Sequence, residues 1–430
     1  MSRPIRIGQL GCGIVGSAVL RQLHANATEI EQRLGARIEV STVAVRSLTK
    51  ERDVPEGTAA LLTTDAHAVV SHPEVDIVVE VMGGIEPART LLLEAIDNGK
   101  HVVTANKELL ASLGQELFDA ADGKGLDLYF EAAVCGGIPL IHPMKESLAG
   151  ERVHKVMGIV NGTTNFILTR MAEEGLEFGD ALAEAERLGY TELDPSADIE
   201  GFDPAAKCAI LASIAFNARV VAGDVYREGI ADITARDIAF AKRLGYTVKL
   251  LAIAEEQDGE IAARVHPAMI PETHPLAAVR ENMNAVFVVG ERVGELMFYG
   301  QGAGGGPTGS SVVGDVVDVA RNIITGGRGP GCTCYEDKPV RPIEGMYSQY
   351  YILLNVADEP GVLATVAHAF GDNNVSISSV WQEGSADEAQ LVMITHRALE
   401  QDLQATLTRL RTTPQVSAIE SVMRVEGGEA

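Results

Sequence analysis

The densest group of residues that could do chemistry lies between positions 185 and 207. Asp203 precedes Pro204, a pair typical of a helix start, because aspartate caps the first turn and proline is tolerated at its first position. Lys207 follows one turn later, on the same face of the predicted helix as Asp203. A lysine beside a carboxylate can exchange a proton with a carbonyl or alcohol oxygen. The pair therefore predicts acid–base chemistry, with a helix cap and an ordinary ion pair as the structural alternative.

Other carboxylates precede this pair in the sequence. Glu192 and Asp198 lie in the same stretch as Asp203. Three carboxylates so close together suit a substrate that carries a positively charged α-ammonium group. This stretch is therefore also a candidate for substrate binding.

A glycine-rich turn near the start of the chain indicates a second kind of site. The apolar run Ile5–Leu10 reads as a buried strand, and it leads into Gly11-Cys-Gly-Ile-Val-Gly16 and then a helix. Glycines at this spacing allow a tight turn and close approach of a pyrophosphate, and the helix N-terminus offers free N–H groups. We therefore predict dinucleotide contacts from the turn and the first helical residues: Gly11, Gly13, Ile14, Val15 and Gly16.

The end of the next predicted strand bears on the choice of cofactor. NAD-binding proteins usually place an acidic residue there, which binds the ribose hydroxyl. Here the strand ends Val43-Ala-Val-Arg46-Ser47, followed by Lys50 and Arg52, with no acidic residue at its tip. Because Arg46 can pair with a 2′-phosphate, NADP is favoured over NAD. A solvent-exposed loop arginine is the alternative.

Composition and charge restrict the class of protein. The 430 residues suffice for two or three domains, and 46% hydrophobic with 22% charged residues is typical of a soluble globular protein. The formal charge of −25 argues against nucleic acid or a membrane as a partner. We see no targeting segment and no apolar run that could span a bilayer, and the five scattered cysteines fit a reducing compartment. We therefore expect a cytoplasmic protein, in which Cys332 and Cys334 are reduced loop thiols.

Three patterns follow one another along the chain. Residues 1–131 alternate short strands with helices, which predicts an α/β fold with a doubly wound parallel sheet of Rossmann type, completed by about residues 307–340. Residues 132–306 read as an α+β domain for substrate binding and dimerisation, with a long helix expected over Pro204–Val221. After a glycine-rich loop, residues 347–430 show a β-α-β-β-α-β order, which predicts a ferredoxin-like domain with its own core.

The segment 185–207 closely resembles the sequence signature of homoserine dehydrogenases. The matching positions are Ala185, Gly189, Asp194-Pro195, Asp198, Gly201, Asp203 and Lys207. The resemblance continues through Thr104–Lys107, Glu131–Pro139, Gly158–Phe166 and the glycine-rich residues 300–306. It thus covers essentially the whole chain. It implies NAD(P)-dependent, reversible reduction of L-aspartate 4-semialdehyde to L-homoserine, in threonine and methionine biosynthesis.

The resemblance also implies roles for single residues. Lys207 would be the proton donor and acceptor, and Lys107 a second active-site lysine near the nicotinamide and the substrate. The implied substrate-binding residues are Glu192, Asp203, Asp198, Gly189 and Thr163, with Asn106 a weaker candidate. Gly302 and Gly304 would join the cofactor site.

Members of this family bind a monovalent cation, usually sodium, through backbone carbonyls. The matching positions here are Glu131, Val134, Gly136 and Ile138. Cys135 departs from the small apolar residue expected between them. This departure leaves a rival reading open, a semialdehyde dehydrogenase that uses Cys135 as its nucleophile. A non-catalytic amino-acid or redox sensor built from the same domains is the other rival, and the set of Asp203, Lys207 and Lys107 argues against it.

The last part of the chain resembles an ACT domain. Such domains pair side by side and bind amino acids near the turn from the first strand into the first helix. Asp358, Gly361 and Asn374 match that location, and the implied effector is threonine. A purely structural dimerisation domain is the alternative. The resemblance implies a homodimer or homotetramer.

Overall fold

The computed structural model of the protein describes residues 3–191, 194–385 and 388–427. Its first sheet has six parallel strands in the order β3-β2-β1-β4-β5-β6. This order is that of dinucleotide-binding Rossmann folds. The strands are β1 (Ile5–Leu10), β2 (Ile38–Ala44), β3 (Leu62–Thr63), β4 (Ile77–Glu80), β5 (His101–Thr104) and β6 (Leu128–Tyr129). The predicted Rossmann-type sheet is confirmed.

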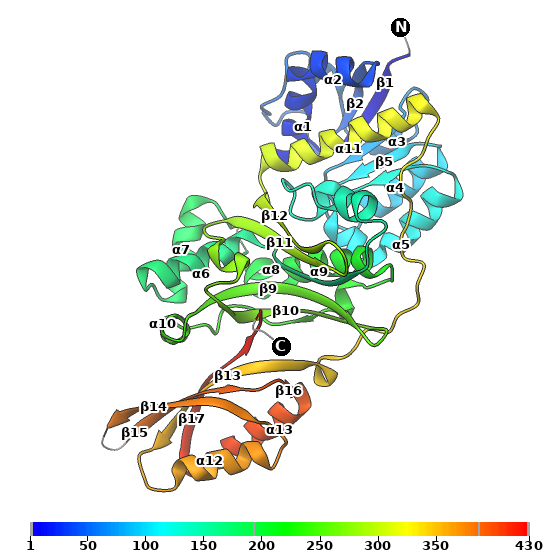
Figure 1. Cartoon of the computed structure of the whole chain (residues 1–430). Coiled ribbons are helices and arrows are strands. Elements are labelled where there is room, and N and C mark those ends of the chain that lie inside the picture. Colours follow the sequence, from blue (N-terminus) through cyan, green and yellow to red (C-terminus); the bar gives the residue numbers. More distant parts are fainter. Residues whose placement is uncertain (1–2, 192–193, 386–387, 428–430) are drawn as a thin grey trace.

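Helices cover both faces of this sheet. The central strands β1 and β4 are almost entirely buried, as expected for a parallel sheet between two helical layers. The helices from this part of the chain are α1 (Ile14–Ala25), α2 (Ala27–Leu34), α3 (Ala66–Val70), α4 (Ala88–Asp97) and α5 (Lys107–Gly123). A late helix, α11 (Gly305–Thr325), returns to the same sheet and packs along α1 (Figure 1).

The middle of the chain forms a second, mixed sheet. Its strands follow the order β12-β11-β7-β9-β10, and they are antiparallel neighbours. They are β7 (Val153–Ile159), β9 (Tyr246–Gln257), β10 (Glu260–Pro271), β11 (Met283–Gly290) and β12 (Gly294–Gln301), with the short β8 (Tyr226–Arg227) paired to β10. The helices are α6 (Gly162–Glu174), α7 (Phe178–Leu188), α8 (Ser196–Ile199), α9 (Phe202–Phe216) and α10 (Ala235–Arg243).

Helix α9 differs from the prediction at both ends. We expected it to run from Pro204 to Val221 with Asp203 as its cap. It begins instead at Phe202, after Gly201 with φ +85°, and it ends before Asn217, whose φ of +51° is left-handed. A left-handed residue cannot continue a right-handed helix, so the apolar run beyond it is not helical.

The C-terminal residues form the expected ferredoxin-like unit. Its sheet order is β17-β13-β15-β14, and both helices lie on one face (Figure 1). The elements are β13 (Tyr347–Ala357), α12 (Val362–Gly371), β14 (Ile377–Ser385), β15 (Glu388–Thr395), β16 (Ala398–Leu399), α13 (Glu400–Arg411) and β17 (Val416–Val425). An apolar core between these helices and the sheet belongs to this unit alone.

This C-terminal unit is joined to the middle sheet in a way that the sequence did not predict. The end of β17 pairs with β10 in parallel, through Arg424 opposite Ala268, so that the chain end returns to the middle sheet (Figure 1). The side chain of Arg264, on β10, is 2% exposed and donates to Glu426 at 2.8 Å. Arg424 pairs with Glu228 of the middle part of the chain at 2.8 Å, and also with Glu400 of its own unit at 2.9 Å. Buried charges therefore link the two units.

No helix in the described parts of the chain combines the length and the hydropathy that crossing a membrane requires.

Candidate active site

The first turn of α9 carries the two residues on which the acid–base prediction depends. Asp203 and Lys207 lie one turn apart, and Lys207 Nζ donates to Asp203 Oδ2 at 2.8 Å. Both side chains are 10% exposed. Asp203 does not cap the helix, because its carboxylate is occupied by side chains instead. Its place in the first turn still puts a negative charge near the positive end of the helix dipole.

Lys207 keeps part of its hydrogen-bonding capacity free for a ligand. Its ammonium group has three N–H donors. One goes to Asp203 and a second to the carbonyl of Val160, at 2.7 Å. No further acceptor is found for it in the described part of the chain. The third donor is therefore available to a substrate oxygen.

A second lysine reaches the same carboxylate from the other sheet. Lys107 begins α5, directly after strand β5, and Asn106 caps this helix by accepting from the N–H of Leu109 at 3.1 Å. The Nζ of Lys107 lies 3.1 Å from Asp203 Oδ1, and its side chain is 36% exposed. Asp203 thus binds one ammonium group from each of the two sheet domains.

Asn161 completes the group, and the sequence analysis did not single it out. Its Nδ2 donates to Asp203 Oδ2 at 2.8 Å and to Asp198 Oδ1 at 2.6 Å. Its Oδ1 caps α6 through the N–H of Thr164. The sequence did carry a signal for Asn161. It lies two residues before Thr163, at the end of a predicted strand, and an asparagine at this place favours a helix N-cap.

These contacts shift the acidities of the group. Burial raises the pKa of Asp203, but Lys207 and Lys107 outweigh it and hold that pKa well below its ordinary value. The same attraction to Asp203 raises the pKa of Lys107. Burial raises the pKa of Asp198. The centre is therefore an ionised carboxylate flanked by two lysine side chains.

The structure describes two of the other predicted substrate residues, Thr163 and Gly189. Thr163 is on α6, and its hydroxyl donates to the carbonyl of Tyr190 at 2.7 Å. Gly189 ends α7 in a left-handed conformation, with φ +75°, and turns the chain toward Tyr190. Glu192 lies outside the described residues.

The fingerprint turn has the shape that a dinucleotide needs. Gly11 has φ +99°, and a Cβ on Gly16 would lie 2.5 Å from the Gly11 carbonyl oxygen, so both positions require glycine. A Cβ on Gly13 would meet nothing within 4 Å, and Ile14 is 80% exposed. Helix α1 has neither a side-chain cap nor an acidic residue in its first turn. Its first N–H groups, at Ile14, Val15 and Gly16, therefore remain free for a phosphate.

The late glycine-rich stretch lies against this turn. A Cβ on Gly305, the first residue of α11, would come within 2.9 Å of Ile14. Gly304 precedes the helix with φ +123°. Gly302 is a glycine for another reason, since any Cβ there would overlap Asn284.

Arg46 follows β2 and is exposed. The structure gives its guanidinium no hydrogen bond or ion pair within the described residues. Arg52, by contrast, is engaged with the carbonyls of Ser47 and Lys50, at 2.7 Å each. Arg46 is therefore the arginine of this loop that is free to meet a phosphate.

The predicted cation ligands form a buried turn between the two sheets. Glu131, Val134, Gly136 and Ile138 are all buried. The Glu131 carboxylate accepts from three successive backbone N–H groups, at residues 140, 141 and 142, and so holds the turn closed. We find no hydrogen bond to the carbonyls of Val134 or Gly136 among the described residues. Buried carbonyls without a donor fit a cation.

A cluster of side chains beside this turn has the composition of a metal site. Glu131, His142 and Asp315 bring their ligand atoms within 4.8 Å of one another. Each is already engaged, because Asp315 Oδ2 accepts from the Glu131 N–H and Asp315 Oδ1 lies 2.9 Å from His142 Nε2. The cluster thus reads as a buried ion pair that ties α11 to the turn.

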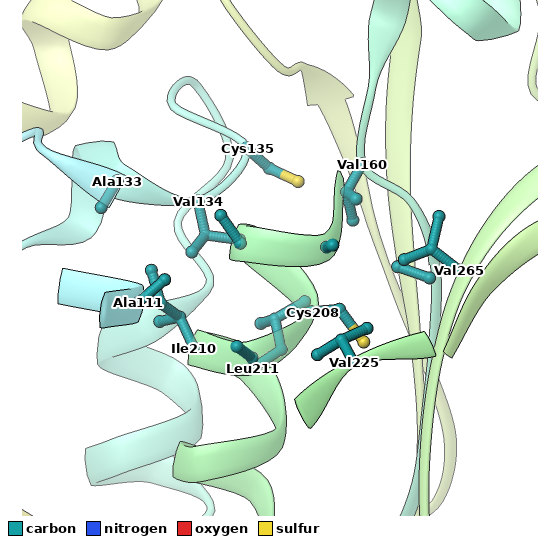
Figure 2. Close-up of a cluster of buried hydrophobic side chains, with 14 of the residues drawn as sticks. Ala111, Ala133, Val134, Cys135, Val160, Cys208, Ile210, Leu211, Val225 and Val265 are labelled. Atoms are coloured by element: carbon teal, nitrogen blue, oxygen red, sulfur yellow. The ribbon is translucent and has the colours of Figure 1, made fainter. Parts of the chain in front are cut away.

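Cys135 is poorly placed for a nucleophile. It is fully buried, its side chain points toward Val160, and Asn284 Nδ2 donates to its Sγ at 3.6 Å (Figure 2). Burial raises the pKa of its thiol, which disfavours the reactive thiolate. The geometry therefore speaks against the semialdehyde dehydrogenase alternative.

The predicted effector residues are not all in one place. Asp358 and Gly361 lie in the exposed turn before α12, where Gln382 Nε2 donates to Asp358 Oδ1 at 3.2 Å. Asn374 follows the other end of α12, a helix of 10 residues and hence about 15 Å long. Within one chain, Asn374 does not share a site with the other two.

Comparison with known proteins agrees with this geometry. The family profile "Homoserine dehydrogenase" matches residues 139–317, and "Homoserine dehydrogenase, NAD binding domain" matches residues 11–131. A homoserine dehydrogenase of Corynebacterium glutamicum is 50% identical over 428 residues, which are 98% of this chain and 96% of the relative. The chain belongs to the homoserine dehydrogenase family. It is therefore grouped with dehydrogenases that act on a CH–OH group.

Other relatives extend the likeness over the whole length. The homoserine dehydrogenase of Mycobacterium tuberculosis strain H37Rv is 49% identical over 99% of this chain and 98% of its own. The crystal structure of a homoserine dehydrogenase from Thiobacillus denitrificans has a TM-score of 0.94 at 43% identity, with 99% of each chain covered. Residues 350–415 match the ACT domain profile, so the C-terminal unit is an ACT domain.

Proposed function

We propose that this protein interconverts L-aspartate 4-semialdehyde and L-homoserine, with Lys207 as the group that exchanges the proton. The observation that carries the proposal is the pair of lysines on one buried carboxylate, Asp203. A sensor would not need a proton donor there. The ionised carboxylate holds both lysines in place, so that one of them can give a proton while the aldehyde is reduced to an alcohol.

The roles of the site residues follow from the N–H donor that Lys207 keeps free. A bound nicotinamide would supply or accept the hydride at the substrate carbon. Lys207 directs its third N–H to the substrate oxygen, gives up a proton as charge develops there, and takes it back in the reverse direction. Asp203 fixes the position of Lys207 and Lys107. Asp198 and Glu192 provide negative charge for the α-ammonium group of the substrate, with Thr163 and Gly189 shaping the same side.

NADP is the cofactor that the loop after β2 favours. Arg46 is exposed and unengaged after β2, where an acidic residue would select NAD. A hyperthermophilic archaeal homoserine dehydrogenase that was solved in complex with NADPH matches 77% of this chain at 27% identity, with a TM-score of 0.65. Its ligand and the free arginine support the same preference.

The buried turn at residues 131–138 supports a monovalent cation, sodium by family resemblance. The backbone carbonyls of Glu131, Val134, Gly136 and Ile138 would hold it. Because this turn joins the two sheets, such an ion would stabilise their relative position, and its chemistry would be structural.

Threonine is the effector that we propose for the ACT domain, bound at the turn of Asp358 and Gly361. Since Asn374 lies at the far end of α12, it could join this site only from a second copy of the chain. Edge strand β14 leaves Val380 and Trp381 about 40% exposed, which supports pairing of two such sheets. We therefore propose a homodimer or homotetramer.

One assay tests these proposals together. Oxidation of NADPH and of NADH is followed with L-aspartate 4-semialdehyde, with and without sodium and threonine. We expect turnover with the semialdehyde, a higher kcat/KM with NADPH, and less activity when threonine is added. No turnover with either cofactor would overturn the proposed reaction. With NADP+ or NAD+ supplied instead, oxidation of the semialdehyde to an acyl product, with reduction of the cofactor, would restore the Cys135 alternative.

A further inference from the structure

Two cysteines outside the active site share a cavity with a charged lysine. Cys332 and Cys334 lie in the loop after α11 and are partly exposed. They line a cavity of about 60 Å³ together with Lys145 and the aromatic rings of Phe118 and Phe130. A cavity of this size has room for several water-sized molecules. A small oxidant could therefore reach the two thiols.

The loop folds the two thiols toward each other. The backbone N–H of Cys334 points at Cys332 Sγ, with 3.4 Å between the atoms. The loop is held on both sides, because the N–H of Cys332 donates to Asp122 Oδ2 at 3.1 Å and the N–H of Glu336 to the carbonyl of Asn217 at 2.8 Å. The pair thus lies between an anchor on α5 and an anchor just beyond α9.

Lys145 is a cation that lacks a carboxylate partner. Its Nζ donates to the carbonyl of Pro330 at 3.1 Å and lies 5.6 and 5.3 Å from the ring centres of Phe118 and Phe130. No carboxylate among the described residues is within ion-pair distance of it. Burial lowers the pKa of Lys145, and the attraction that opposes this comes first from Cys332. A thiolate is therefore the anion that this lysine is placed to stabilise.

The remaining charges around the pair are few. A hydrogen bond from the Cys334 thiol lowers the pKa of Cys332, Lys145 adds to this effect, and Asp119 opposes it. The same hydrogen bond raises the pKa of Cys334, while Lys145 and Arg219 act to lower it. Asp122 is a further negative group beside the loop. Of the two thiols, Cys332 is the one that ionises first.

We propose that Cys332 and Cys334 form a redox-active thiol pair that hydrogen peroxide converts to an intramolecular disulfide. The Cys332 thiolate attacks one peroxide oxygen, the O–O bond breaks, and the released hydroxide takes up a proton to give water, leaving a sulfenic acid. The Cys334 thiol then attacks the sulfenic sulfur, the S–S bond forms and a second water leaves. Two electrons pass from the thiols to the peroxide, and a dithiol reductant reverses the change.

Alkylation of the full-length protein with iodoacetamide tests the first step. We expect Cys332 to react at least about tenfold faster than Cys334 at neutral pH, with a half-maximal rate below the ordinary thiol range. Lys145→Met should move that midpoint upward, whereas Lys242→Met, at an exposed site, should not. The buried Cys12, Cys135 and Cys208 serve as internal standards. If wild-type Cys332 titrates like an ordinary thiol, the proposal fails, whatever the folding of the lysine variant.

Oxidation with hydrogen peroxide tests the second step. After proteolysis, the wild-type peptide that carries both cysteines should have lost two hydrogen atoms, and dithiothreitol should restore them. Cys334→Ser should stop at a sulfenic acid that dimedone traps at Cys332, and Cys332→Ser should leave Cys334 almost unoxidised. An intermolecular disulfide between two chains, or no reaction of the wild-type pair, would overturn the assignment.

Discussion

At the scale of single residues, the arrangement around Asp203 explains why a helix start alone could not reveal its role. In the sequence, aspartate before proline reads as a cap. In the structure, its carboxylate contacts Lys207, Lys107 and Asn161 instead, and the helix begins at Phe202, directly after Gly201. Lys107 and Asn161 are far from Asp203 in the chain, so only the fold brings them together. Family resemblance predicted Lys107, and nothing in the sequence analysis predicted Asn161.

Arg46 allows a residue-scale test of cofactor choice. Arg46→Asp removes a partner for the 2′-phosphate and adds an acceptor for the ribose hydroxyl. We expect the ratio of kcat/KM for NADPH over NADH to fall by at least about tenfold, or ~1.4 kcal/mol. The matched control is Arg52→Asp, since Arg52 is engaged with backbone carbonyls within its own loop. An unchanged ratio in Arg46→Asp would show that Arg46 only faces solvent.

At the scale of elements, the alternation of strands and helices predicted the Rossmann-type sheet, but not the short elements α2, β3 and α3. Apolar strands such as β4 are buried on both faces, and that pattern is visible in any window of the sequence. The ends of helices and the pairing of distant strands were harder to predict. Helix α9 stops at Asn217 because of one left-handed residue, and asparagine alone does not announce that conformation. The pairing of β17 with β10 depends on two residue pairs far apart in the chain, and no local pattern encodes it.

His142 tests how α11 is fastened to the turn at 131–142. Burial disfavours the charged form of His142, but the hydrogen bonds that its ring donates to the carboxylates of Asp315 and Asp318 outweigh this and raise the pKa of His142 to about 10. Because the folded pKa lies above the ordinary histidine value, the stabilisation is complete below that ordinary value and is lost as pH rises toward about 10.

We therefore expect His142→Gln to lower the Tm at about pH 6, and the difference from wild type to shrink by about pH 10. The control is His67→Gln, since the His67 side chain is 66% exposed and pairs with Glu94 at the surface. A difference in Tm that does not change with pH would show that His142 contributes packing and no charge.

At the scale of the whole molecule, the ACT domain is connected to the catalytic part by both a strand pairing and buried charges. This bears on how regulation can be tested. Removal of the residues after about 345 would take away β17 and Glu426, one of the two carboxylate partners of Arg264. A loss of activity after such a truncation could reflect the broken junction, and so substitutions in the full chain are the better experiment.

Glu426→Gln isolates this connection. It leaves Arg264 short of a buried anionic partner, which costs on the order of 3 kcal/mol of folding free energy. We expect a lower Tm and a weakened effect of threonine, because the strand that joins the two units is loosened. The control is Glu420→Gln, at the exposed part of β17, where the ion pair with Arg236 spans 3.9 Å. Equal Tm values for the two variants would mean that the units are not coupled through Arg264.

The central claim is that Lys207 exchanges the proton with the substrate oxygen, and the turnover of Lys207→Ala tests it most directly. The measurement is kcat for NADPH-dependent reduction of L-aspartate 4-semialdehyde, together with the Kd for NADPH from fluorescence titration. Lys207 contacts Asp203 and Val160 and lies on a different domain from the glycine turn. We predict that kcat falls by far more than tenfold while the Kd for NADPH changes less than about threefold. A variant that keeps more than about a tenth of wild-type turnover, equivalent to only ~1.4 kcal/mol of barrier, would contradict the assignment.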